Sequence, residues 1–208
     1  GTLTCCQIDL LKLFKGGFST GHGFLREPND IMSYAALAAI AIQSNQNDQH
    51  GGQSIPFFDY GLADGVKKTF RKSYTDHLQQ GLELMLDLED EELADMKGFI
   101  EKVEENSGAT LQLSLTDEYK QAEKKQLMEQ FNMDEKLAGK IQRFAYKESH
   151  KETKRKTYQA MEAFIHNLNT MHSRAGAQVP FSSVNFGTDT SAEGRMVTEN
   201  LLLSVESG

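Results

Sequence analysis

Residues 134–172 read DEKLAGKIQRFAYKESHKETKRKTYQAMEAFIHNLNTMH, and this stretch decides most of the fold. Proline occurs only three times in the chain, so long helices meet few interruptions. Near the end of the stretch, Met161, Phe164, Ile165 and Leu168 recur at the spacing of one helix face. The sequence therefore predicts one long helix here, with a buried face in its C-terminal half.

Further helices are predicted on both sides of this stretch. Asn29 or Asp30 is placed to cap a helix that runs to about Gln46, and a helical region is predicted over 62–105. Thr116 is a good cap for the helix that follows. The other predicted boundaries are interruptions near Gly81 and Gly98, a break near 132–134, and a loop followed by a helix over 188–205.

Two apolar runs read as strands. Residues 3–14 and 178–186 are short and compatible with β structure, and 54–58 is a brief extended segment. Two strand candidates separated by long helices indicate pieces of an α/β barrel or sheet.

Composition limits the class of protein. The 208 residues are 38% hydrophobic and 25% charged, which is typical of a globular chain. The net charge of −8 argues against a dedicated nucleic-acid surface, because neutralising phosphates needs a basic face. No apolar run is long enough to span a bilayer, and no secretory leader opens the chain, so we expect a cytoplasmic location. The first residue is Gly1 rather than Met, so we expect the chain to begin inside a longer protein.

The adjacent cysteines Cys5 and Cys6 lie in the first predicted strand, where side chains alternate between two faces. One face carries Leu3, Cys5, Gln7 and Asp9, and the other carries Thr4, Cys6, Ile8 and Leu10. The polar groups beside its thiol make Cys5 the better candidate for a catalytic site, and Cys6 the better candidate for core packing. A free cysteine is commonly just a small buried hydrophobe, so a purely structural Cys5 is the commoner outcome on the strand pattern alone.

Two polar segments are candidates for ligand recognition. Residues 45–53 read NQNDQHGGQ, and amides suit recognition because they donate and accept hydrogen bonds without titrating. The alternative is a hydrogen-bonded loop that caps its neighbours. Residues 172–190 combine small residues, glycines and two adjacent hydroxyls, a composition that lets backbone approach phosphates, although no Walker or dinucleotide pattern is present. His166 and His172 are six residues apart on a helix and do not share a face, so no metal site is expected.

A basic stripe follows the long helix at steps of three and four residues: Lys140, Arg143, Lys147, Lys151 and Lys154. Such a stripe is usually solvated or faces an acidic partner, and residues 87–105 hold nine acidic and two basic residues. The third interpretation is that the stripe holds a triphosphate by charge complementarity.

Taken together, three segments resemble one family: 5–10 (CCQIDL), 47–53 (NDQHGGQ) and 159–174 (QAMEAFIHNLNTMHSR) with its continuation to Gly194 and Arg195. They are similar to the anaerobic, class III ribonucleoside-triphosphate reductases, which are glycyl-radical enzymes. Residues 178–195 are the most specific part of the resemblance, and 85–135 are less distinctive.

The resemblance implies a fold and a domain organisation. We expect an α/β fold, a partial ten-stranded barrel of the glycyl-radical type that is largely helical in this chain. Residues 1–208 would form a single partial domain, the N-terminal half of the catalytic barrel. Within it, 62–172 would be the mainly helical region that makes the dimer contact and binds the effector.

The resemblance also implies a reaction. Ribonucleoside triphosphates are reduced to deoxyribonucleoside triphosphates with formate as reductant, which supplies DNA replication. A radical stored on a C-terminal glycine passes to a cysteine on a finger loop, and a second cysteine on the first strand helps to remove the 2′ hydroxyl. That second cysteine corresponds to Cys5, and the expected substrate contacts are Ser182, Ser183 and Asn185.

Other parts of the family pattern find no counterpart here. No segment resembles the radical glycine, the finger-loop cysteine, the four-cysteine zinc site or the ATP-binding regulatory region. We therefore expect no cofactor within 1–208 and no activity from this chain alone, with the glycyl radical and zinc residing elsewhere in the parent.

The implied partners are a ribonucleoside triphosphate, a deoxynucleotide effector, a radical-SAM activating enzyme and a second copy of the chain. The expected effector contacts are Gln46, Gln49, Lys147, Lys151 and Lys154. Two alternatives stay open: another glycyl-radical enzyme such as a formate-lyase type, and a nonenzymatic helical module for nucleotide binding or dimerisation. The preferred nucleotide does not follow from the sequence.

Overall fold

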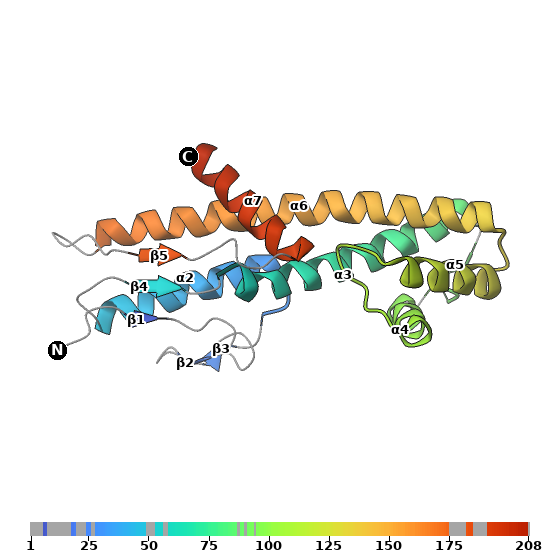
Figure 1. The fold of residues 1–208 in the computed structure, drawn as a ribbon, viewed down its shortest axis with the longest axis horizontal. Helices are drawn as coiled ribbons and strands as arrows, with labels where there is room; N and C mark the ends of the chain where they lie inside the picture. Colours follow the sequence, from blue (N-terminus) through green and yellow to red (C-terminus); the bar gives the residue numbers. More distant parts are fainter. Residues whose placement is uncertain are drawn as a thin grey trace. The chain divides into compact units, whose positions relative to one another are not determined.

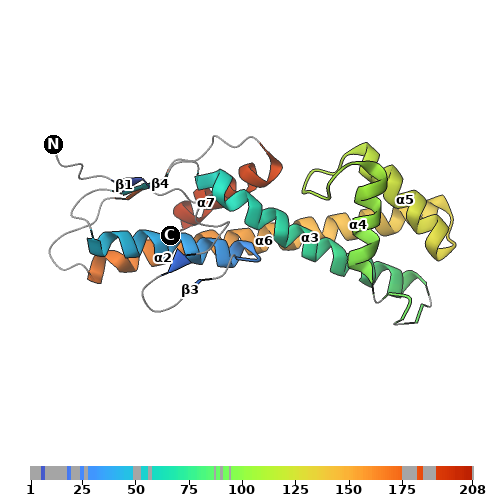
Figure 2. The same ribbon diagram turned by 90° about the horizontal axis from the view of Figure 1, so that it is seen from below.

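Helices account for most of the chain that the computed structural model describes (Figures 1 and 2). The described residues are 6–7, 18–19, 24–25, 28–48, 53–55, 58–86, 88–89, 91–93, 95–174, 182–184 and 191–207. In chain order the elements are β1 (Cys6–Gln7), β2 (Phe18–Ser19), β3 (Phe24–Leu25), α2 (Ile31–Asp48), β4 (Gln53–Ile55), α3 (Phe58–Met85), α4 (Met96–Ser107), α5 (Asp117–Phe131), α6 (Glu135–Arg174), β5 (Ser182–Val184) and α7 (Ala192–Ser207).

The chain divides into two compact units. The terminal unit combines residues 1–69 with 154–208, and the central unit is the continuous segment 70–153. The boundary therefore falls inside α3 and α6, each of which contributes residues to both units. Residues 1–208 as a single partial domain, and 62–172 as a dimer and effector region within it, stay predictions.

The terminal unit contains a small parallel sheet in the order β1-β4-β5 and a separate antiparallel pair, β2 with β3. Its helices α2 and α3 pack closely because the residues between them are small. A Cβ on Gly65 would lie 3.0 Å from the Tyr34 ring and 3.1 Å from the Cα of Ile31, so only glycine fits there without a shift. The buried apolar residues of α2 are Ile31, Tyr34, Ala35, Leu37, Ala38, Ala39, Ala41 and Ile42.

The central unit is built from the second part of α3, the helices α4 and α5, and the first part of α6. Figure 2 shows α4 lying against α5. Burial of Met96, Phe99, Ile100 and Val103 turns one face of α4 inward, while its acidic residues stay largely outside. The acidic run over 87–105 is thus partly a helix with a solvated face, as predicted.

Local capping residues fix where the central helices begin and end. The Thr116 side chain accepts a hydrogen bond from the backbone N–H of Tyr119 at 3.2 Å, which confirms the predicted cap of α5. Asn132 adopts a left-handed conformation with φ 52° and ends α5, which confirms the predicted break. The predicted helix over 134–172 is confirmed as α6, and Met161 and Phe164 on its predicted apolar face are buried.

The prediction of an interruption near Gly81 is wrong, because α3 continues through it to Met85. A Cβ on Gly81 would lie 3.2 Å from Phe144 and 3.4 Å from Ile141, so this glycine lets α6 pack closely without breaking its own helix. The second predicted interruption, near Gly98, is also displaced. Asp95 accepts the backbone N–H of Gly98 and caps α4, which places Gly98 in the first turn of that helix.

The fold-class prediction of a partial α/β barrel is wrong for the described residues. They are mainly helical, and their strands are two or three residues long, too short and too few to close a barrel. The apolar runs at 3–14 and 178–186 contribute only two and three described ladder residues, respectively. Between these two runs the described residues form mainly long helices, with β2, β3 and β4 as short strands, and the buried apolar residues lie mostly on helices.

Two carboxylates in the central unit meet α3 in different ways. Glu104 of α4 accepts two hydrogen bonds from the Arg71 guanidinium, at 2.9 and 2.5 Å, and one from the backbone N–H of Leu111 at 2.8 Å. Burial raises the pKa of Glu104, but these donors outweigh it and the net pKa is lowered. The result is a partly buried ion pair that holds α4 on α3.

Glu123 of α5 contacts Tyr74, three residues after Arg71 on α3, and makes no ion pair with any described residue. It is fully buried, and its Oε1 accepts hydrogen bonds from the Tyr74 hydroxyl at 2.5 Å and from the Gln142 amide at 3.1 Å. Its Oε2 and the Tyr119 hydroxyl have no hydrogen-bond partner among the described residues. Burial raises the pKa of Glu123 despite these donors, because loss of water disfavours the charged form.

Candidate functional site

The parallel sheet of the terminal unit brings together three segments that the sequence had singled out separately (Figure 1). Cys6 on β1 is the Cα partner of Gln53 on β4, and Gln53 is the partner of Ser182 on β5. The next row pairs Gln7, Ser54 and Ser183 in the same way. The cysteine strand, the end of the amide segment and the serine run are therefore neighbours in space.

The predicted site residues are placed unequally. Ser182 and Ser183 lie on β5, and Gln46 lies in α2. Cys5, Gln49 and Asn185 lie outside the described residues. The prediction that Cys5, rather than Cys6, is the thiol on the polar face of the strand therefore stays a prediction. The structure therefore brings the backbone of these segments together, and the roles of the individual side chains stay predictions.

The basic stripe lies on α6 and is open to solvent. Its five residues Lys140, Arg143, Lys147, Lys151 and Lys154 are all exposed. Among the described residues, none of the five makes an ion pair, so the described part of 87–105 does not pair with this stripe, and Asp87 and Asp90 lie outside the described residues. Glu104 of the acidic run pairs with Arg71 of α3 instead.

A polar cluster that sequence reasoning missed joins α2 to α3 in the terminal unit. The Tyr34 hydroxyl donates to the Asp64 carboxylate, and the Lys68 ammonium donates to the Tyr34 oxygen at 2.9 Å and to the Pro28 carbonyl at 3.1 Å. Burial, followed by the bond to Asp64, raises the pKa of Tyr34 to about 12. Tyr34 thus stays a neutral phenol, and the cluster anchors the start of α2. The readable signal was the i, i+4 spacing of Asp64 and Lys68.

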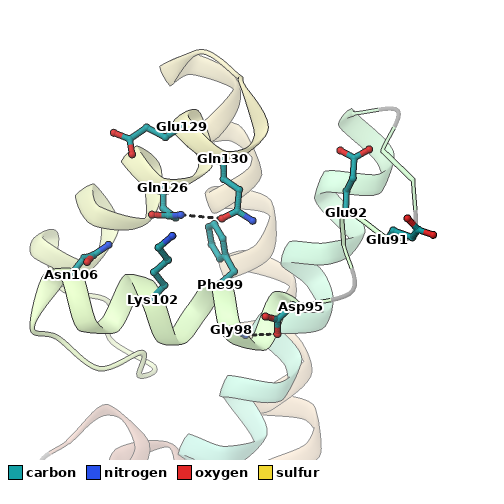
Figure 3. Close-up of a pocket in the computed structure, with 10 residues that line it drawn as sticks. All are labelled: Glu91, Glu92, Asp95, Gly98, Phe99, Lys102, Asn106, Gln126, Glu129 and Gln130. Carbon is teal, nitrogen blue, oxygen red and sulfur yellow. Dashed lines mark hydrogen bonds between the residues drawn. The ribbon is translucent and has the colours of Figure 1, made fainter.

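An open groove of about 760 Å³ lies in the central unit between α4 and α5 (Figure 3). Figure 3 shows one cation, Lys102, among the carboxylates that line it: Glu91, Glu92, Asp95 and Glu129. This acidic lining repels phosphates, so the groove is a poor candidate for a nucleotide site. The Asp95 carboxylate is also already occupied as the cap of α4.

Metal binding finds no support in the part of the chain that is described. No group of three or more His, Cys, Asp or Glu side chains is placed there to hold a metal ion. The sequence holds two cysteines, Cys5 and Cys6, so it does not supply a four-cysteine zinc site. Separately, none of the helices in the described ranges is long and apolar enough to cross a membrane.

The sheet joins the cysteine, amide and serine segments on which the resemblance to ribonucleotide reductases rests, and comparison with known proteins agrees with that class. A family model described as anaerobic ribonucleoside-triphosphate reductase matches residues 1–208, so the chain belongs to that family of oxidoreductases. The chain is also 23% identical over 198 residues to the anaerobic ribonucleoside-triphosphate reductase of Enterobacteria phage T4. That match covers 95% of this chain and 23% of the phage protein, so the chain spans about a quarter of its relative. The resemblance stated from the sequence is confirmed.

Proposed function

We propose that this chain is a part of an anaerobic reductase that converts ribonucleoside triphosphates to deoxyribonucleoside triphosphates with formate as reductant. The observation that carries the proposal is the register of the parallel sheet, in which the cysteine strand lies beside Gln53 and Ser182. Family membership over the whole chain supports it. It also favours this function over another glycyl-radical enzyme and over a nonenzymatic helical module.

The proposed chemistry assigns a limited part of the reaction to this chain. Overall, formate is oxidised to carbon dioxide, the ribose loses its 2′ hydroxyl as water, and a hydrogen replaces it. The Cys5 thiol supplies hydrogen as the 2′ hydroxyl departs, because a thiol gives up hydrogen far more readily than an alcohol. Ser182, Ser183 and Asn185 bind the substrate. The radical that starts the reaction is supplied from a glycine elsewhere in the parent, and zinc belongs to cysteines outside this sequence.

The test uses the full-length parent with its activating enzyme under anaerobic conditions. Cys5→Ser should abolish deoxynucleotide formation while the glycyl radical still appears by electron paramagnetic resonance. Cys6→Ser is the matched control on the same strand, and it should lower stability while retaining turnover. Loss of turnover in a well-folded Cys6→Ser protein, with Cys5→Ser active, would reverse the assignment. The chain of 208 residues alone should form no deoxynucleotide, since no third cysteine is present to carry the thiyl radical.

The proposal includes regulation by a deoxynucleotide effector at a contact between two copies of the chain in the cytoplasm. Lys147, Lys151 and Lys154 are exposed and make no ion pair with any described residue, which supports an effector contact on α6 with Gln46 and Gln49 as base or sugar contacts. Lys147→Glu combined with Lys151→Glu should remove the heat of effector binding in calorimetry, and salt should weaken binding to the unaltered chain. Because the stripe makes no ion pair among the described residues, thermal stability should change little. A large loss of stability with intact affinity would instead show that the stripe has a structural role.

A further inference from the structure

A second groove in the central unit has the opposite charge to the one in Figure 3. It lies between α5 and α6, has a volume of about 300 Å³, and is lined by Lys120, Lys124 and Arg143 together with Gln142, Tyr146 and Gly139. No carboxylate lines it. Its volume is at the small end of the range for small-molecule sites, roughly 300–1,000 Å³.

Two of the cations converge on one point above the backbone. A Cβ on Gly139 would lie 3.3 Å from Nη1 of Arg143 and 3.9 Å from Nζ of Lys124. The absence of a side chain at Gly139 therefore leaves a small cradle beneath an ammonium and a guanidinium. Two like charges brought to the same place repel each other, and an anion between them removes that cost.

The charges of this groove are poorly compensated by the protein itself. Among the described residues, Lys120 and Arg143 make no ion pair. Lys124 lies 3.7 Å from Glu135, but Glu135 is 75% exposed, and exposed pairs contribute little. The groove thus presents a net positive charge to whatever enters it.

The walls of the groove are held in place by bonds to other elements. The Gln142 amide donates to the Lys120 carbonyl at 2.9 Å and to Glu123 at 3.1 Å. The Tyr146 hydroxyl donates to the Leu113 carbonyl at 3.0 Å, and its ring packs edge-on against Phe70. A site that is already shaped loses less entropy when a ligand binds.

We propose that the α5/α6 groove binds a small phosphate-bearing anion, with Arg143 and Lys124 holding a phosphate above Gly139 and Lys120 at the rim. The planar guanidinium of Arg143 suits two parallel hydrogen bonds to phosphate oxygens, and Lys124 adds a point charge. The inference is independent of the reductase activity. It also differs from the effector contact proposed on the stripe, because Lys147, Lys151 and Lys154 do not line this groove.

The experiment is calorimetry on the full chain with three probes: inorganic phosphate, inorganic triphosphate and ATP. We expect binding of the triphosphate that weakens as salt rises from about 0.05 to about 0.5 M. Equal affinity for ATP and inorganic triphosphate assigns recognition to the phosphates alone, and tighter binding of ATP adds a contact to the nucleoside; both outcomes support the site. Absence of binding by all three probes at low salt would overturn it.

Variants separate the groove from neighbouring surface charge, and binding from folding. Arg143→Gln and Lys124→Gln should each weaken binding by about tenfold or more, the usual effect of losing a charge-assisted hydrogen bond. Lys125→Gln, the exposed neighbour of Lys124 on α5 that does not line the groove, is the matched control and should leave affinity unchanged. Gly139→Ala should fill the cradle and remove binding, while the melting temperature holds or rises because alanine favours helix. Wild-type affinity in both Arg143→Gln and Gly139→Ala, or an equal loss in Lys125→Gln, would contradict the proposal.

Discussion

Two pairs hold a glutamate against α3 in different ways: the ion pair Arg71–Glu104 and the hydrogen-bonded pair Tyr74–Glu123. Their α3 residues are three positions apart. Burial opposes ionisation of Glu104, but the Arg71 guanidinium and the Leu111 N–H hold its pKa below the usual range, and part of the side chain reaches water. Glu123 is fully buried, and its neighbours are phenols and an amide. The comparison shows two directions of pKa shift: a guanidinium beside Glu104 helps to lower its pKa against burial, and burial raises the pKa of Glu123, whose donors are neutral.

The largest expected effect comes from emptying the buried position. Glu123→Ala should lower the free energy of unfolding by about 2–4 kcal/mol, because it leaves a cavity and removes the hydrogen-bond acceptor of the buried Tyr74 hydroxyl. Urea unfolding followed by circular dichroism measures the change. Glu129→Ala, on the exposed side of α5, is the control and should stay within about 0.5 kcal/mol of the unaltered chain. An equal loss in the free energy of unfolding for both variants would mean that the buried position of Glu123 does not contribute to stability.

The ion pair should have a smaller effect. Arg71→Ala should cost about 1–2 kcal/mol, since the pair is bidentate but a third of the Arg71 side chain is exposed. Glu104 would retain its bond from the Leu111 backbone. Lys72→Ala, the exposed neighbour on α3, should change the same unfolding curve little. A cost for Arg71→Ala above that of Glu123→Ala would reverse the order of the two sites.

The two carboxylates should respond to pH with opposite signs. Glu123 has a raised pKa when folded, so its contribution is fully present below its unfolded pKa of about 4.3 and is lost as pH rises through the folded pKa. Glu123→Gln should therefore become more stabilising, relative to the unaltered chain, as pH increases above about 4.3. The pKa of Glu104 is lowered, so its contribution is present above its unfolded value and is lost on acidification; Glu104→Gln should cost most near neutral pH. Parallel pH profiles for the two variants would contradict the comparison.

The smallest expected difference between the two sites is in how the stability loss of each variant depends on salt. Raising ionic strength from about 0.05 to about 1 M should reduce the cost of Arg71→Ala by a few tenths of a kcal/mol, because the pair is partly exposed and screened. The cost of Glu123→Ala should not change, since no ion pair is lost there. A double series of unfolding curves at the two salt concentrations measures both. Equal salt sensitivity would show that Glu123 is charged and coupled to a cation.

Local signals predicted the helices well, and tertiary contacts account for the misses. The cap at Thr116 and the break at Asn132 could be read because their effect is carried by neighbouring residues. Gly81 could not, since its reason for being glycine is the approach of Phe144 from a distant helix. The barrel was predicted from the two strand candidates and from the resemblance, and the described strands are too short for it.

The sequence predicted which segments form the candidate site in the terminal unit, but it did not predict how the sheet places them side by side. The cysteine strand, the amide segment and the serine run stood out by composition, whereas the register that joins Gln53 to Ser182 depends on pairing across most of the chain. Glu123 does have a signal in the sequence, because it lies four residues from both Tyr119 and Leu127 and so shares a helix face with them, where a carboxylate is uncommon. Gly139 gave no signal, because its significance lies in the side chains that reach over it.

The division of the chain has a consequence for the order in which it folds. The central unit is continuous, so its helices can find one another through nearby contacts as soon as residues 70–153 have been made. The terminal unit needs both ends of the chain, and β4 cannot meet β5 until synthesis has passed Val184. During translation we therefore expect the sheet that contains the cysteine strand to remain incomplete after the helices of the central unit have formed. Long-range parallel pairing is slow, so assembly of this sheet should be the late step of folding and the one most exposed to aggregation.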